Sequence, residues 1–148
     1  MKKFVFTNQS LLRIKNDEHE RLKRELENVD KRIRLIDTEI VSIDGRVAAE
    51  QQKQERDCET GTDAQQLIRY EDFFRYMREK REAAQKARAE LEKERAVIQK
   101  ELFAVHNQIK VLEEMRDAQY QEYLKEVALD ESKELETMMS FNLYEGAS

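Results

Sequence analysis

Residues 22–47 read LKRELENVDKRIRLIDTEIVSIDGRV, and apolar side chains recur in this stretch at alternating steps of four and three residues. This spacing is a heptad repeat, which is typical of a coiled-coil helix. Extended backwards, the repeat also places Leu12 and His19 at seam position a. A disordered polar segment would show no regular apolar spacing. The seam residues of the quoted stretch are Leu26, Ile33, Ile40 and Val47 at position a, and Leu22, Val29, Ile36 and Ile43 at position d.

A turn is expected at residues 58–62, where the sequence is CETGT. Gly61 can adopt the left-handed backbone conformation that ends a helix. Thr62 and Gln65 have the spacing of a capping box, which would start a second helix. At the other end, Thr7 is the expected N-cap of the first helix. The sequence therefore predicts two helices joined by a short turn.

A second heptad repeat follows the turn and continues for seven heptads. Because the connection is short, the two helices should lie side by side and antiparallel. The expected fold class is all-α, a long two-helix antiparallel coiled-coil hairpin that forms a single domain over residues 1–148. The second seam consists of Leu67, Phe74, Arg81, Arg88, Arg95, Leu102 and Ile109 at position a, and Tyr70, Met77, Ala84, Leu91, Ile98, Val105 and Leu112 at position d.

The two helices are expected to differ in length. The first should cover about residues 8–57, and the second about 63–139 before a short C-terminal tail. At the rise of an α-helix they are roughly 75 Å and 115 Å long, so the second overhangs the first by roughly 40 Å. The overhang carries an apolar stripe that needs a partner, with fraying or dimerisation as alternatives. Its members are Met115, Tyr120, Tyr123, Leu124, Val127, Leu135, Met138 and Met139.

Three successive a positions of the second helix are Arg81, Arg88 and Arg95. Arginine can lay its methylene groups along a seam and keep its charged group in water. One interpretation is that these arginines set the register and the pairing of the helices. The other is that they make the stalk pliable or face a partner.

The composition of the chain excludes several classes of function. The 148 residues carry a net charge of −5, whereas nucleic-acid binding needs a basic face. No run of 18 apolar residues is present, so no membrane span is expected. The opening MKKFVF is interrupted by polar TNQS, which indicates a protein that stays in the cytosol. Cys58 is the only cysteine, so an internal disulfide is not possible.

No constellation of residues predicts catalysis. Asp17, Glu18, His19 and Glu20 are adjacent, but consecutive helix residues point about 100° apart and cannot converge on one metal ion. His106 has no cysteine or acid at ligand spacing, and no glycine-rich phosphate loop occurs. We therefore expect no enzyme activity, no cofactor and no metal site.

Two stretches resemble a known family. Residues 2–29 read KKFVFTNQSLLRIKNDEHERLKRELENV, with a basic, Phe-containing start, a leucine pair and an acidic–basic helix. Residues 67–77 read LIRYEDFFRYM, in which Tyr70 and Phe73 form a tyrosine–phenylalanine pair three residues apart. Both stretches, and the two-helix outline of the whole chain, resemble the FliJ family of flagellar type III export proteins.

The resemblance implies a cytosolic, non-enzymatic protein of the flagellar export apparatus, peripheral to the inner face of the membrane at the flagellar base. Proteins of this family look like the coiled-coil shaft of the ATP synthase gamma subunit. The implied partners are the hexameric export ATPase, the cytoplasmic domain of the export gate (FlhA) and export chaperones. A generic structural spacer or self-associating adaptor remains the alternative, and a helical-hairpin enzyme or metal protein is the third.

The family's gate-contacting face matches positions near the turn. On the first helix these positions lie near Glu39, Ile43, Arg46 and Glu50, where the charged residues depart from the family pattern. On the second helix, Phe73 falls at heptad position g, beside the seam. The expected gate-binding set is Ile43, Arg46, Tyr70, Phe73, Tyr76, Met77 and Lys80. The set expected to meet the ATPase ring is Phe4, Phe6, Leu112, Met115, Tyr120, Leu124, Val127, Leu135 and Met138.

Overall fold

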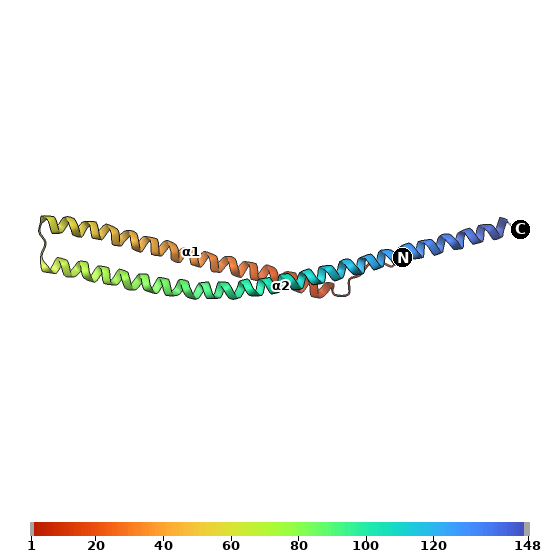
Figure 1. Ribbon diagram of the computed structural model, residues 1–148, viewed down its shortest axis with the longest axis horizontal. Coiled ribbons are helices and arrows are strands. Elements are labelled where there is room, and N and C mark those ends of the chain that lie inside the picture. Colours follow the sequence, from red (N-terminus) through yellow and green to blue (C-terminus); the bar gives the residue numbers. More distant parts are fainter. Residues whose placement is uncertain (1, 147–148) are drawn as a thin grey trace. The chain divides into compact units, whose positions relative to one another are not determined.

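The computed structural model describes residues 2–146 and contains two helices in this range. Helix α1 spans Gln9–Thr60 and helix α2 spans Ala64–Gly146 (Figure 1). No strand occurs among the described residues. The predicted all-α fold with an antiparallel coiled-coil hairpin is confirmed.

Residue contacts group the chain into two units, each with a segment from both helices. The hairpin unit comprises residues 21–102. The terminal unit comprises the residues up to Glu20 and those from Phe103 onwards. A single domain over the whole chain stays a prediction.

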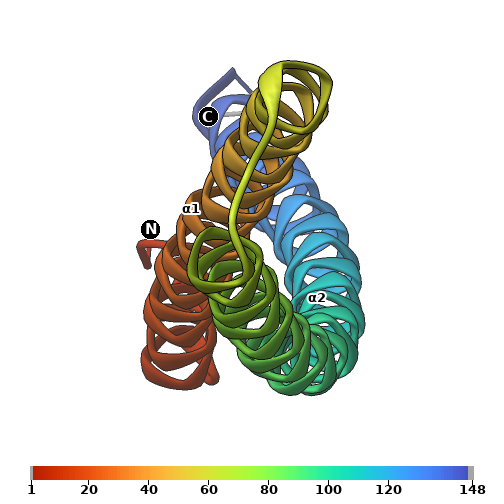
Figure 2. The same cartoon turned by 90° about the vertical axis from the view of Figure 1, so that its left-hand side faces the viewer.

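The turn between the helices is shorter than expected. Helix α1 continues three residues beyond the predicted end, and Gly61 follows it with a φ of 99°. Figure 2 shows the turn crossing from the end of α1 to the start of α2. The capping box is displaced by one residue from the predicted Thr62, because Asp63 Oδ1 accepts a 2.8 Å hydrogen bond from the backbone N–H of Gln66. The carboxylate of Asp63, and not the hydroxyl of Thr62, therefore accepts from a free N–H of the first turn.

The outer ends of both helices also differ from the prediction. Helix α1 begins one residue later than a Thr7 cap would give. The Asn8 carbonyl accepts the first helical hydrogen bond, from Leu12 N at 3.0 Å, so Asn8 is the N-cap residue. Helix α2 continues to Gly146, so the residues expected to form a tail after 139 are helical. The last turns contain no proline and no internal glycine that would end the helix sooner.

The two predicted seams form the core. All seven d positions of α2 are buried, whereas its a positions are half-buried, apart from the buried Ile109 and the exposed Leu67 near the turn. On α1 every predicted seam residue is buried or half-buried, including His19. The heptad assignment is therefore confirmed at nearly every position. The most deeply buried side chains are Leu12, Leu22 and Met77.

The three seam arginines of the hairpin unit pair with aspartates of α1. Arg81 Nε lies 2.8 Å from Asp44 Oδ1, Arg88 Nε 2.6 Å from Asp37 Oδ1, and Arg95 Nε 2.7 Å from Asp30 Oδ1. Each step along this ladder moves seven residues forward on one helix and seven back on the other, which is what an antiparallel coiled coil requires. The interpretation that the arginines pair the helices is confirmed.

The ladder shifts the pKa values of its members. The hydrogen bond from Arg81 holds the pKa of the Asp44 carboxyl below its ordinary value, and the same bond raises the pKa of Arg81. The bond to Asp37 likewise raises the pKa of Arg88. All these side chains keep substantial contact with water, so each pair alone adds little stability. Because the pairs repeat every seven residues on both helices, they fix the register of the two helices more than they add to the stability of the hairpin.

Candidate partner-binding surfaces

The residues expected at the gate-binding tip divide into two groups, and one group lies inside the hairpin. Ile43 is 2% exposed and Met77 is 1% exposed, so both side chains are packed between the helices. Tyr70 is also buried, and its hydroxyl donates a hydrogen bond to Asp57 Oδ2. These three residues offer a partner almost no surface and instead hold the two helices together beside the turn.

The bond between Tyr70 and Asp57 changes the acidity of the phenol. The carboxylate acceptor, reinforced by burial, raises the pKa of Tyr70 to about 12. A hydrogen bond to the protonated form disfavours ionisation. Because Asp57 lies in the last turn of α1 and Tyr70 in the second turn of α2, the bond fastens the helices close to the turn.

The other group forms an accessible patch on the hairpin unit. The guanidinium carbon of Arg46 lies 5.8 Å from the centre of the Phe73 ring, a cation–π distance. Phe73 also makes an edge-to-face contact with Phe74, with ring centres 5.7 Å apart. Tyr76 is exposed and Lys80 is half-buried on the same helix. Arg46, Phe73, Tyr76 and Lys80 are therefore the predicted tip residues that a partner can reach; they are called the tip patch below.

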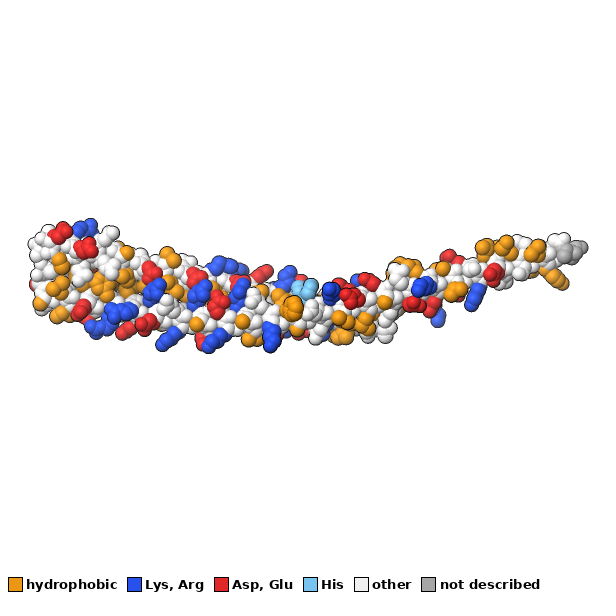
Figure 3. Space-filling model, in the orientation of Figure 1, with side chains coloured by type: hydrophobic (Ala, Val, Ile, Leu, Met, Phe, Trp, Pro, Cys, Tyr) orange, Lys and Arg blue, Asp and Glu red, His pale blue; other side chains and the backbone are white. Residues whose placement is uncertain are grey.

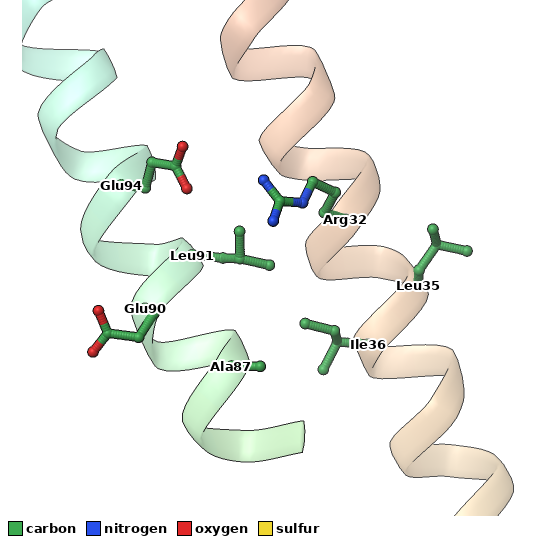
Figure 4. Close-up of a pocket in the computed structure, with 7 residues that line it drawn as sticks. All are labelled: Arg32, Leu35, Ile36, Ala87, Glu90, Leu91 and Glu94. Carbon is green, nitrogen blue, oxygen red and sulfur yellow. The ribbon is translucent and has the colours of Figure 1, made fainter. Parts of the chain in front are cut away.

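A groove lies further along the hairpin unit. Its volume is about 460 Å³, and it opens where the small side chain of Ala87 faces Ile36 (Figure 4). Arg32 projects from α1 toward Glu94 of α2 across this groove, and Leu91 forms part of its wall. The charged members of the lining are Arg32, Glu90 and Glu94, and the other members are apolar.

The structure of the terminal unit differs from the expectation that the overhang has no intramolecular partner. Phe4 packs against Tyr120 with ring centres 5.1 Å apart, and against Tyr123 at 5.5 Å. The Tyr123 hydroxyl donates a 2.8 Å hydrogen bond to the Lys2 carbonyl. Phe6 is 5% exposed and Leu112 is also buried. The N-terminal residues thus cover the first part of the overhang (Figure 1).

Beyond this cover, α2 is exposed throughout residues 128–146, which we call the uncovered stretch. Leu135 and Met138 lie here as predicted, at 60% and 63% exposure. In Figure 3, hydrophobic side chains are spaced along the C-terminal part of α2. Part of this surface was not predicted, because the helix was expected to end at about 139 and instead continues to Gly146. The hydrophobic residues of this part are Phe141, Leu143 and Tyr144, whereas the exposed Leu129 lies within the predicted helix and was not included in the expected stripe.

The two histidines of the chain lie near each other. The rings of His19 and His106 lie with centres 6.2 Å apart in the terminal unit. Within residues 2–146, no cluster of three or more His, Cys, Asp or Glu side chains could hold a metal ion. In the same range, neither helix has a stretch apolar and long enough to cross a membrane.

The sequence matches the family described as Flagellar FliJ protein over residues 8–142. The chain belongs to the FliJ family. No curated protein and no solved structure matches the chain. Membership in the FliJ family identifies a coiled-coil protein of flagellar export, associated with the export apparatus, in a structural, non-enzymatic family.

Within this FliJ-family chain, the contact between Arg46 and Phe73 could have been found from the sequence. Both residues occupy heptad position g. In an antiparallel coiled coil, the g positions of the two helices lie on the same side of the seam. The charge at Arg46, which seemed to depart from the family pattern, therefore sits where it can contact the aromatic ring. The contact between Phe4 and the tyrosines had no such signal, because a short extended segment has no periodicity.

Proposed function

We propose that this protein is a non-enzymatic coiled-coil stalk that links the hexameric flagellar export ATPase to the cytoplasmic domain of the export gate, FlhA. It acts in the cytoplasm, peripheral to the inner face of the membrane at the flagellar base, and also interacts with export chaperones. In this role it supports flagellum assembly. The observation that carries the proposal is the FliJ-family match over residues 8–142.

The structure supports a linking role because the two units carry separate accessible surfaces. The tip patch of the hairpin unit combines an aromatic ring, a phenol and two cations. Aromatic residues and arginine are the residue types that most often dominate the energy of protein interfaces. In the proposed complex, Phe73 is the anchor toward the gate, and Tyr70, Met77 and Ile43 position it from the core.

The uncovered stretch of the terminal unit supplies the second surface. An apolar helical stripe without a covering partner is a typical site for protein association. In the proposal, Leu135 and Met138 of this stretch face the inner surface of the ATPase ring, together with Leu124 and Val127 just before it. Met115 and Tyr120 lie earlier on the same helix and are exposed as well.

The tip assignment is tested by Phe73→Ala with Phe103→Ala as a matched control. Phe103 is an exposed phenylalanine of α2 that belongs to the other unit. We expect Phe73→Ala to weaken binding to the gate domain by about fivefold or more, as loss of an interface anchor does. Phe103→Ala should leave the gate affinity unchanged.

Affinity is measured by titrating the labelled gate domain, and thermal melting of each variant is followed by circular dichroism. In a parallel assay, the ATPase rate is measured with and without each variant, and both should stimulate it as the wild type does. A fall in melting temperature of several degrees with unchanged gate affinity would show that Phe73 is a core residue.

The exposed apolar residues of the uncovered stretch also favour a second candidate, a self-associating coiled-coil adaptor. Sedimentation separates the two functions. A stalk that enters a ring should be monomeric when free, whereas the adaptor should form a dimer or tetramer at all concentrations and leave the ATPase rate unchanged.

A further inference from the structure

The N-terminal residues 2–6, called the strap below, lie on α2 without forming a helix or strand. Two features hold the strap. Its Phe4 ring contacts both Tyr120 and Tyr123, and its Lys2 carbonyl accepts the hydrogen bond from the Tyr123 hydroxyl. The charges on the two sides are complementary, because Lys2 and Lys3 line the same groove of about 550 Å³ as Glu122 and Glu126.

The strap occupies the beginning of an apolar stripe that continues beyond it. Tyr120, Leu124 and Val127 follow one another at steps of four and three residues, and Leu135 and Met138 continue the same face. Tyr123, which contacts Phe4, is half-buried, and so is Val127, whereas every side chain from 128 to 146 is exposed. Tyr120 contacts Phe4 and still remains 43% exposed, so the strap covers only part of this face at its start, and the face is open along the rest.

We propose that the strap is a displaceable cover, which competes with the export ATPase for the start of the α2 stripe. This inference rests on the proposed function. The free protein would keep Phe4 on the tyrosines, and the ATPase ring would have to displace it in order to contact Tyr123 and the side of Tyr120 that Phe4 covers. The affinity of a site that is open only part of the time is reduced by the fraction of molecules in which it is open.

The structure favours displacement over a fixed docking. The strap is a short extended segment, so its release breaks no helix or sheet. Val5 is 77% exposed and therefore does little to hold the strap. The Phe4 ring is the apolar group that attaches the strap to the tyrosines. Phe6, in contrast, is buried and precedes α1, so it can stay in place as the hinge. An aromatic contact changes such an equilibrium by about two- to tenfold.

The first test releases the strap. Phe4→Ala should tighten the apparent affinity for the export ATPase by about three- to tenfold, because it removes the competing ring. Tyr123→Phe keeps the ring and removes the hydrogen bond to Lys2, so it should tighten binding by a smaller factor. Val5→Ala, an exposed position in the same strap, is the matched control and should bind as the wild type does. Circular dichroism checks that each variant keeps its helix content.

The second test locks the strap. In a Cys58→Ser background, cysteines at positions 4 and 123 are joined by a short bismaleimide, and the comparison sample carries N-ethylmaleimide on both thiols. The joined protein should bind the ATPase at least about tenfold more weakly than the comparison sample, because the open fraction is removed. Both samples carry the same substitutions, so the difference reports the tether alone.

The outcomes separate the strap from the stalk function. If the wild type binds the ATPase but Phe4→Ala binds more weakly, the strap is part of the contact surface and the inference is wrong. If the joined and comparison samples bind equally, the strap is not a competitor and the inference is equally wrong. If the wild type and every released variant fail to bind, the proposed function fails, and the competition proposed for the strap fails with it.

Discussion

Two stretches of α2 are built from similar residues and differ in what covers them. Along residues 70–112, every d position is buried against α1. Along the uncovered stretch, methionine, leucine, phenylalanine and tyrosine side chains lie in water on the same kind of helix. The difference shows that the local sequence of this chain suffices for helix, whereas a partner decides which apolar residues become core. Each prediction below exchanges the same or a similar residue in the two stretches.

The largest contrast is expected between two methionines. Met77 is 1% exposed in the seam, and Met77→Ala should lower the free energy of unfolding by about 3 kcal/mol through lost burial and the cavity left behind. Met138 is exposed, so Met138→Ala should change it by less than about 0.5 kcal/mol. Urea unfolding followed by far-ultraviolet circular dichroism measures both. Equal losses would mean that the uncovered stretch is packed in solution, for example in a dimer.

The buried seam that contains Met77 could be predicted from the sequence, because heptad spacing is a local property that fixes which face of each helix is apolar. The Arg–Asp ladder could have been predicted from the sequence in the same way. Asp30, Asp37 and Asp44 repeat every seven residues, as the three arginines do, although the sequence analysis did not use this match. Once two seams are aligned, charges at matching spacing must face each other.

Other features could not be predicted because they depend on competition between near-equal choices or on contacts distant in sequence. Thr62 and Asp63 are both good N-caps, and the geometry of the turn selects Asp63. The covering of Tyr120 and Tyr123 by Phe4 joins residues more than a hundred positions apart, through a strap with no periodic pattern. The tip patch was predicted in part, since heptad position g placed Phe73 outside the seam.

A smaller contrast is expected between two cations. Arg88→Glu places a carboxylate beside Asp37 and Glu92, so the repulsion should lower the melting temperature by a few degrees, and more at low salt than at high salt. Adding Asp37→Arg should restore most of the loss by rebuilding the pair in reverse. Lys133→Glu in the uncovered stretch should leave the melting temperature nearly unchanged. A ladder that sets no register would show no rescue by the second substitution.

The smallest contrast is expected between two tyrosines, and it depends on pH. The hydrogen bond to Asp57 and burial raise the pKa of Tyr70 to about 12 in the folded protein, whereas a tyrosine in an unfolded chain ionises at about 10. A raised pKa means that the folded state favours the protonated phenol. Its contribution to stability is therefore complete below pH about 10 and is lost as the pH rises from about 10 to 12.

Tyr70→Phe removes the group that titrates. The variant should be less stable than the wild type below pH about 10, and this difference should shrink as the pH rises to about 12. Tyr144, which is 79% exposed, gives the control, because Tyr144→Phe should follow the wild-type curve at every pH. Urea midpoints across this pH range measure the effect. A constant difference between Tyr70→Phe and the wild type would show that the phenol contributes by packing alone, without the bond that fastens α1 to α2 beside the turn.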